Sequence, residues 1–120
     1  LEEISRFILE DKRLTTAFKR LRHRIDTTIH QVVEYPSLIK ARKSTRDIGR
    51  NIYINELKRK NCQDIFFANI QRVKESTRVL EEFSKLKNQK VALGFKKIRY
   101  TLYEIEKKAT RKVAALCNYR

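Results

Sequence analysis

The sequence predicts an all-α protein, and three observations support this fold class. Glycine and proline, the residues that most disfavour helices, number only two and one in 120 residues. Apolar side chains recur every three or four residues, which places them on one face of a helix. No stretch alternates convincingly between apolar and polar residues as a strand does. The predicted architecture is a helical bundle of two repeated helix-turn-helix units joined by a polar segment.

Two helices are expected in the first part of the chain. Residues 1–9 have the pattern of the end of a helix, and EDK at 10–12 interrupts that pattern. Asp11 is a suitable N-cap for a second helix over about 12–33, because its carboxylate can accept a hydrogen bond from a free backbone amide. Pro36 disfavours a helical residue before it and so ends this helix. The apolar stripe of the second helix consists of Leu14, Phe18, Leu21, Ile25, Ile29 and Val32.

The following segment, residues 34–60, is predicted to be a connector. Residues 39–53 are polar, lack a clear period and hold one of the two glycines, which predicts a loop or short helical turns. A short helix is expected at about 52–60.

Two long helices are expected after the connector. Asn61 is a suitable cap for a helix that ends near Leu86, and after a turn at 87–90 the last helix spans about 91–115. The apolar sector of the first of these helices contains Ile70, Val73, Thr77, Leu80 and Phe83.

Length and charge narrow the class of protein. A chain of 120 residues is expected to form one domain, residues 1–120. Its net charge of +15 attracts polyanions without indicating which kind. No apolar run is long enough for a membrane span or a signal peptide. Two cysteines, Cys62 and Cys117, do not make a disulfide framework and lie near no histidine at a metal-ligand spacing, so we expect a cytoplasmic protein.

The two ends of the chain resemble each other. LEEISR at 1–6 matches LEEFSK at 80–85, and LTTAFKRLRHRI at 14–25 matches VALGFKKIRYTL at 91–102. These matches predict a repeat at about 1–33 and 61–115; the alternative is chance similarity between helices rich in Lys, Leu and Glu. ANIQRVKESTRV precedes the second LEE, and its counterpart would precede Leu1 in a chain that has no methionine. We therefore expect the first copy to begin upstream of Leu1.

Polar residues fall within the apolar sector of the 61–86 helix. Asn69 and Ser76 project into this sector and Arg72 lies at its edge. An unpaired amide in a core costs on the order of 1–3 kcal/mol, and an unpaired guanidinium costs more. Such residues form an internal polar network or line a cleft. Polar groups beside apolar walls favour a small-molecule pocket, for which Glu75 is a further candidate.

Arg22 and Arg99 occupy equivalent positions in the two copies, each at the edge of an apolar stripe. An arginine in this position can hold a phosphate or carboxylate with two parallel hydrogen bonds. The alternative is an ion pair within the chain, with Glu2, Glu3, Glu81 or Glu82. No glycine-rich phosphate loop, dinucleotide fingerprint, esterase or zinc-protease motif is present, so a phosphate would be held by side chains and helix N-termini.

Several of these segments resemble one known family, and they occur in the family's order. FKRLRHRI resembles its K-x-x-R-H element, RDIG its D-[VI]-G loop, ELKR its E-x-x-R element, and ANIQRVKESTRVLEE its N-x-x-R-x-x-E-x-x-R-V-L-E-E signature. The family is the small all-helical hydroxymethylpyrimidine-phosphate kinase, which occurs alone or fused ahead of thiamine-phosphate synthase. The resemblance extends from Leu1 to about Lys108.

The resemblance implies a phosphotransferase of thiamine biosynthesis. The reaction would move a phosphoryl group from ATP, with Mg²⁺, to 4-amino-5-hydroxymethyl-2-methylpyrimidine phosphate, giving the diphosphate. Such transfer depends mainly on positioning and charge neutralisation. The matched positions are Asn69, Arg72, Glu75, Arg78, Arg22, His23, Asp47, Gly49, Glu56 and Arg59.

The roles that the resemblance implies are distributed as follows. Arg72, Arg22 and Arg99 would hold phosphates, and Asn69 would bind the pyrimidine or a phosphate. Glu75 or Asp47 would hold Mg²⁺ and, with Arg72, act in catalysis. The remaining matched residues would help to bind the substrate: His23, Arg78, Arg59, Gly49 and Glu56. Arg78 lies opposite the apolar stripe, which favours an ion pair with a nearby glutamate or a contact with another subunit.

Two other functions remain open at the level of sequence. A basic helical module could bind RNA or another polyanion, although its cations are spread over several helices without an aromatic stacking platform. An accessory domain could dimerise and support a fused thiamine-phosphate synthase without binding nucleotides.

Overall fold

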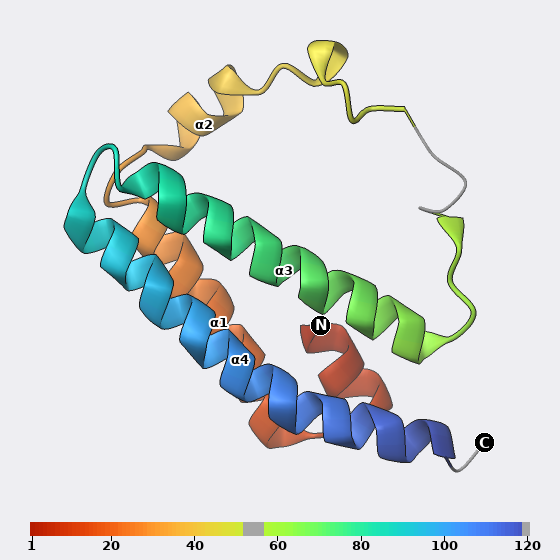
Figure 1. Ribbon diagram of the computed structural model, residues 1–120. Coiled ribbons are helices and arrows are strands. Elements are labelled where there is room, and N and C mark those ends of the chain that lie inside the picture. Colours follow the sequence, from red (N-terminus) through yellow and green to blue (C-terminus); the bar gives the residue numbers. More distant parts are fainter. Residues whose placement is uncertain (52–56, 119–120) are drawn as a thin grey trace.

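The computed structural model describes residues 1–51 and 57–118, and the side chains of these residues except 117 and 118 (Figure 1). Within these residues the regular structure is helical, with no strand, so the predicted all-α class is confirmed. The helix expected at about 52–60 falls largely outside the described residues, and residues 58–60 are not helical. The Cys117 side chain also lies outside them.

Helix α1 (Lys12–Ile29) begins where the sequence predicted. The Asp11 carboxylate accepts a hydrogen bond from the Leu14 amide at 2.9 Å, which satisfies one of the free donors of the first turn. The helix ends at Ile29, four residues before the predicted end at residue 33, and a turn follows over residues 30–32. Before it, residues 4–8 form one short wide turn, η1 (Ile4–Ile8), in which the Leu9 amide binds the Ile4 carbonyl.

Helices α3 (Cys62–Ser84) and α4 (Gln89–Asn118) form an antiparallel hairpin. Asn61 caps α3 as predicted, and its side chain accepts a hydrogen bond from the Asp64 amide at 2.9 Å. Asn88 accepts hydrogen bonds from Lys90 and Val91, so α4 begins at Gln89 and not at residue 91.

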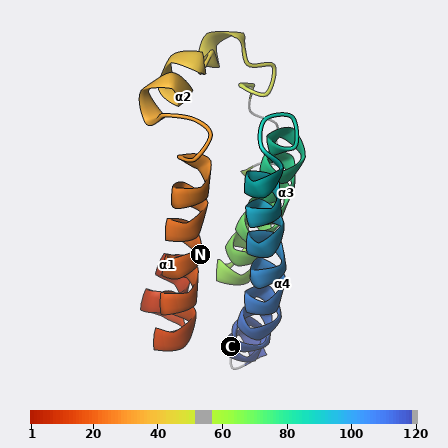
Figure 2. The same cartoon turned by 90° about the vertical axis from the view of Figure 1, so that its left-hand side faces the viewer.

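Helix α4 is the centre of the packing. It packs against α3 and also against α1, while η1 packs against α1 (Figures 1 and 2). Its buried stripe alternates at three and four residues, so one face of the helix supplies most of the core. The buried core residues are Leu14, Phe18, Leu21, Phe66, Ile70, Val91, Phe95, Ile98, Leu102, Ile105, Ala109 and Val113.

The apolar sector predicted for α3 is wrong at its last turn. Phe83 is 68% exposed, and the buried face continues instead through Thr77, Glu81 and Ser84. These three residues are spaced at i, i+4 and i+7, so they lie in one row along the helix, whereas Phe83 lies about 100° away from Ser84. A prediction from hydrophobicity alone therefore assigns Phe83 to the buried face in place of its neighbour Ser84.

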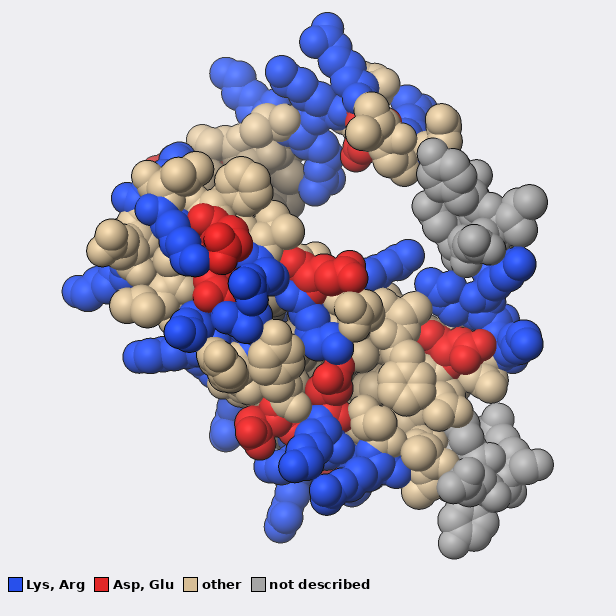
Figure 3. All heavy atoms as spheres, viewed as in Figure 1, with Lys and Arg blue, Asp and Glu red and all other residues tan. Residues whose placement is uncertain are grey.

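Residues 34–51 of the connector form an arch that follows α1 in the chain (Figure 1). It contains two short helices, α2 (Tyr35–Ala41) and η2 (Ser44–Arg46), which agrees with the short turns predicted there. The prediction that Pro36 ends the first long helix is wrong, because α1 already ends at Ile29. Pro36 lies instead in the first turn of α2, where its missing amide hydrogen is tolerated. Every residue from 34 to 51 is exposed, and the arch stands clear of the helices in the space-filling view (Figure 3).

Candidate functional site

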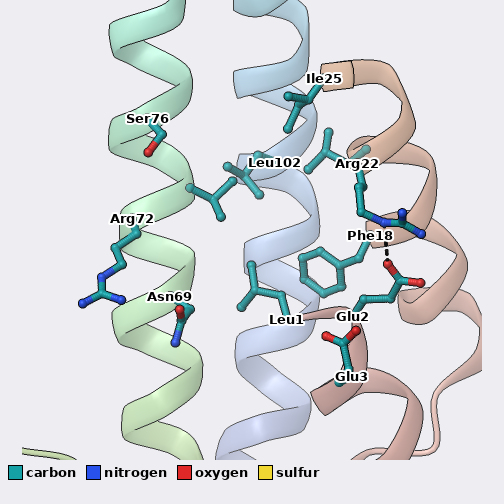
Figure 4. Close-up of a pocket in the computed structure, with 12 residues that line it drawn as sticks. Leu1, Glu2, Glu3, Phe18, Arg22, Ile25, Asn69, Arg72, Ser76 and Leu102 are labelled. Carbon is teal, nitrogen blue, oxygen red and sulfur yellow. Dashed lines mark hydrogen bonds and ion pairs between the residues drawn. The ribbon is translucent and has the colours of Figure 1, made fainter. Parts of the chain in front are cut away.

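A pocket of about 630 Å³ lies between α1 and α3, and the first residues of the chain close one side of it (Figure 4). Its size is in the range of small-molecule sites. The helix α4 contributes Leu102 to it. The lining residues are Leu1, Glu2, Glu3, Phe18, Leu21, Arg22, Ile25, Asn69, Arg72, Val73, Ser76 and Leu102.

The polar wall on α3 consists of Asn69, Arg72 and Ser76, the polar residues of its apolar sector. Asn69, Arg72 and Ser76 all line the pocket, as the pocket interpretation predicted. The Asn69 amide donates to the Ile65 carbonyl at 2.7 Å, which fixes the side chain on its own helix. Arg72 makes no ion pair with any residue that the structure describes, and its guanidinium points away from α1 at the rim of the pocket (Figure 4). These residues therefore do not form a closed internal network.

The opposite wall carries an arginine and two carboxylates. Arg22 of α1 donates from Nε to the Glu2 carboxylate at 3.0 Å, and Glu3 lies beside this pair (Figure 4). The Arg22 side chain is 62% exposed, so it can also turn a donor toward a ligand. Leu1, Phe18 and Leu102 lie between the two walls, where they provide an apolar floor (Figure 4).

The pocket can therefore hold a small planar molecule that carries an anionic group. Apolar side chains would contact the faces of a ring, the Asn69 amide could pair with its heteroatoms, and Arg22 or Arg72 could bind a phosphate with parallel hydrogen bonds. The sequence pattern predicts Glu2 and Glu3 only as partners of arginines. Their place at the pocket depends on how residues 1–9 fold back on α1, which the local pattern does not show.

Arg99 does not line this pocket. It binds Glu81 through two hydrogen bonds of 2.6 and 3.1 Å, and the side chains are only 9% and 6% exposed. The Arg99 guanidinium holds the pKa of the Glu81 carboxyl below its ordinary value, and the Glu81 carboxylate raises the pKa of Arg99. For Arg99 the structure thus shows the ion pair within the chain.

Three predicted site residues on the main helices also lie outside the pocket. His23 is exposed on α1. Glu75 is exposed on α3 and accepts a hydrogen bond from Gln71 at 3.1 Å. Arg78 approaches Glu82 within 3.6 Å, one of the ion pairs that its position opposite the stripe favoured.

The connector residues are not brought to the pocket either. The Asp47 carboxylate accepts a hydrogen bond from the Gly49 amide at 2.7 Å, which forms a local turn in the exposed arch. Arg59 is half-buried and donates to the neighbouring Lys58 carbonyl. Glu56 lies outside the described residues. Neither Asp47 nor Glu75, the two predicted metal ligands, lines the pocket.

A Mg²⁺ ion that arrives with phosphates needs few protein ligands, often one or two carboxylates. In the part of the chain that the structure describes, no three His, Cys, Asp or Glu side chains gather into a metal site. Glu2 and Glu3 are the carboxylates that line the pocket, so they fit a Mg²⁺ held partly by a substrate.

The fold and the pocket together define an all-α domain with a polar pocket between its helices. A sequence profile described as the ThiD2 family matches residues 1–108, and the chain belongs to this family. Curated relatives named thiamine-phosphate synthase are similar to it: the protein of Synechocystis sp. is 34% identical over 107 residues, and that of Nostoc punctiforme is 35% identical over 107 residues. The protein of Rhodopirellula baltica is 30% identical over 117 residues.

The chain corresponds to only part of these relatives. The matches cover 88%, 88% and 97% of this chain but 30%, 29% and 31% of the relatives, in the same order. The family and its relatives place the chain in the context of thiamine biosynthesis. No solved structure matches the chain significantly.

In the described part of the chain, no helix is both long enough and apolar enough to cross a membrane.

Proposed function

We propose that this chain is a kinase that phosphorylates hydroxymethylpyrimidine phosphate with ATP and Mg²⁺, and so supplies the diphosphate used in thiamine biosynthesis. One observation carries the proposal: residues far apart in the sequence, Arg22 on α1 and Asn69 and Arg72 on α3, line a single pocket with an apolar floor. Membership of the ThiD2 family agrees with this activity.

In this proposal the pyrimidine ring lies on the apolar floor, and Asn69 binds its edge. Arg72 closes over the phosphates from the rim, since its long side chain can rotate without any ion pair to break in the described part of the chain. Arg22 stabilises negative charge on the opposite wall, while Glu3, with Glu2, would hold Mg²⁺. When bound, this ion supplies charge neutralisation for the transferred group.

The test measures ADP release with Mg²⁺-ATP, with and without hydroxymethylpyrimidine phosphate. We expect release to require the pyrimidine phosphate and Arg72→Ala to lower kcat/KM by about 100-fold, the usual cost of one lost charge-stabilising donor. Asn69→Ala should raise KM. Arg20→Ala is the control, because Arg20 is an exposed arginine on α1 that does not line the pocket.

Two outcomes would contradict the proposal. One is ADP release that does not depend on the pyrimidine phosphate in the folded protein, and the other is an equal loss of activity in Arg72→Ala and Arg20→Ala.

An accessory role beside thiamine-phosphate synthase is the second candidate, because the chain spans about 30% of relatives that carry that name. It would be favoured if the chain binds the pyrimidine phosphate in calorimetry but releases no ADP with it. The RNA-binding alternative is not favoured by the surface, where Lys and Arg are spread over the arch and the helices (Figure 3).

A further inference from the structure

A second concave site lies on α4, at its contact with α1, and it shares no residue with the first pocket. Its volume is about 660 Å³. Four of its lining residues are cations, namely Arg24, Lys90, Lys96 and Lys97, and no carboxylate lines it. Leu102, which faces the first pocket, lies on a different side of α4 from Lys97, because five residues turn a helix by about 140°.

These cations have no acidic partners among the residues that the structure describes. Within residues 1–51 and 57–116, none of the four forms an ion pair, whereas Arg22, Lys74, Arg99 and Lys112 each do. A concave surface lined by one sign of charge concentrates the electric field and attracts the opposite charge. The four cations therefore repel one another until an anion neutralises them.

The close approach of the two helices shapes this site. A Cβ atom at Gly94 would lie 3.3 Å from the Thr28 methyl group, so glycine lets α1 and α4 approach closely there. Arg24 reaches from α1 across this contact and donates to the Thr101 hydroxyl at 3.3 Å. This hydrogen bond holds the guanidinium beside the lysines of α4.

The site also has an aromatic wall. Tyr100 is 54% exposed, and the Lys96 ammonium lies 6.0 Å from the centre of its ring. An exposed ring next to several cations can contact a base or ribose while the cations bind phosphates.

From this arrangement we propose that the α1–α4 site binds an oligophosphate, either inorganic triphosphate or the phosphate chain of a nucleotide. The four cations match the charge of a triphosphate. The four cations line one concave site, which favours a compact ligand over an extended nucleic-acid backbone.

The experiment titrates the full chain with sodium triphosphate, with ATP without Mg²⁺, and with monophosphate, using isothermal calorimetry. Arg24→Gln with Lys97→Gln should weaken triphosphate binding at least tenfold. The matched control is Lys107→Gln with Lys108→Gln, which removes the same charge from exposed positions on the same helix outside the site, and it should change binding less than twofold. Amide resonances of Gly94 and Thr101 should shift on addition of triphosphate.

The relative affinities for ATP, triphosphate and an oligonucleotide distinguish the ligands of this site. ATP binding that is tighter than triphosphate binding, and that weakens in Tyr100→Ala, identifies a nucleotide as the ligand; equal affinities identify the phosphate chain alone. Equal weakening in both double variants, or tighter binding of a single-stranded oligonucleotide than of triphosphate, would overturn the proposal. Arg72→Ala should keep triphosphate binding at this site, so failure here is distinct from failure of the kinase proposal.

Discussion

Two arginines at equivalent positions of the predicted repeat differ in their surroundings. Arg99 forms a buried ion pair with Glu81, while Arg22 forms an exposed ion pair with Glu2 beside an open pocket. Glu2 and Glu81 also correspond in the repeat, so the same type of ion pair occurs in both halves. The difference in burial explains why one pair serves mainly stability and the other can serve a ligand.

This difference predicts unequal costs of substitution. Arg99→Ala should lower the free energy of unfolding by about 3–5 kcal/mol, because it leaves the buried Glu81 carboxylate without a partner. Arg22→Ala should cost about 1 kcal/mol or less, because its pair is exposed. Urea denaturation followed by circular dichroism would measure both, and equal costs would show that the Arg99–Glu81 pair is not buried in solution.

Glu81 also predicts a dependence of stability on pH. Its carboxyl pKa is lower in the folded state than the ordinary 4.5, chiefly because Arg99 donates hydrogen bonds to it. The ionised Glu81 carboxylate therefore contributes to the free energy of unfolding. This contribution is fully present above the ordinary pKa and is lost as the pH falls through the lowered pKa. Arg99 stays charged throughout this acidic pH range, so it adds no pH dependence of stability of its own.

Thermal unfolding between neutral pH and about pH 3 would test this dependence. Glu81→Gln should lose less stability on acidification than the unchanged protein. Glu104→Gln serves as the control, because Glu104 is an exposed carboxylate on α4. This variant should lose as much stability on acidification as the unchanged protein does. The assignment of this pH dependence to Glu81 fails if the stability of the two variants falls equally steeply with pH.

At the scale of elements, side-chain caps determine where the helices begin. The side chains of Asp11, Asn61 and Asn88 each accept a hydrogen bond from a backbone amide at the start of a long helix. Asp11 and Asn88 occupy equivalent positions in the predicted repeat. Burial is also matched, since Leu14, Phe18 and Leu21 correspond to Val91, Phe95 and Ile98 and all six are buried. The repeat stays a prediction, which these matched environments support.

Removing a cap should have a modest and measurable effect. Asn61→Ala should destabilise the protein by about 1 kcal/mol, because one amide of the first turn of α3 loses its acceptor. Asn51→Ala, at an exposed position in the arch, should change stability by less than about 0.5 kcal/mol. A loss at Asn51 as large as that at Asn61 would contradict the capping role.

At the scale of the whole molecule, a packed helical body carries an exposed basic arch. Limited digestion with trypsin should cut first within residues 40–50, since Lys40, Arg42, Lys43, Arg46 and Arg50 are all exposed there. The two fragments should remain together, because the core joins residues of α1 to residues of α3 and α4. Mass spectrometry would identify the first cut, and gel filtration would show whether the fragments separate. A first cut within α4 would contradict this arrangement.

The sequence by itself determined the helical class, the three long helices, two of their caps and the polar sector of α3. These features depend on local chemistry: the period of apolar residues, the hydrogen bonds of capping side chains, and the rarity of glycine and proline. The sequence also selected Arg22, Asn69 and Arg72, because a polar side chain in an apolar stripe needs an explanation wherever the helix packs.

Only the tertiary structure decided which of these side chains share a pocket. Local pattern could not show that residues 1–9 fold back on α1 and bring Glu2 and Glu3 to its edge, nor that Asp47 and Gly49 remain in an exposed arch. It also could not distinguish Ser84 from Phe83 as the buried residue of the last turn of α3, because that depends on where the hairpin places α4. Contacts between segments distant in the sequence are set by how whole helix faces pack, and no single helix contains that information.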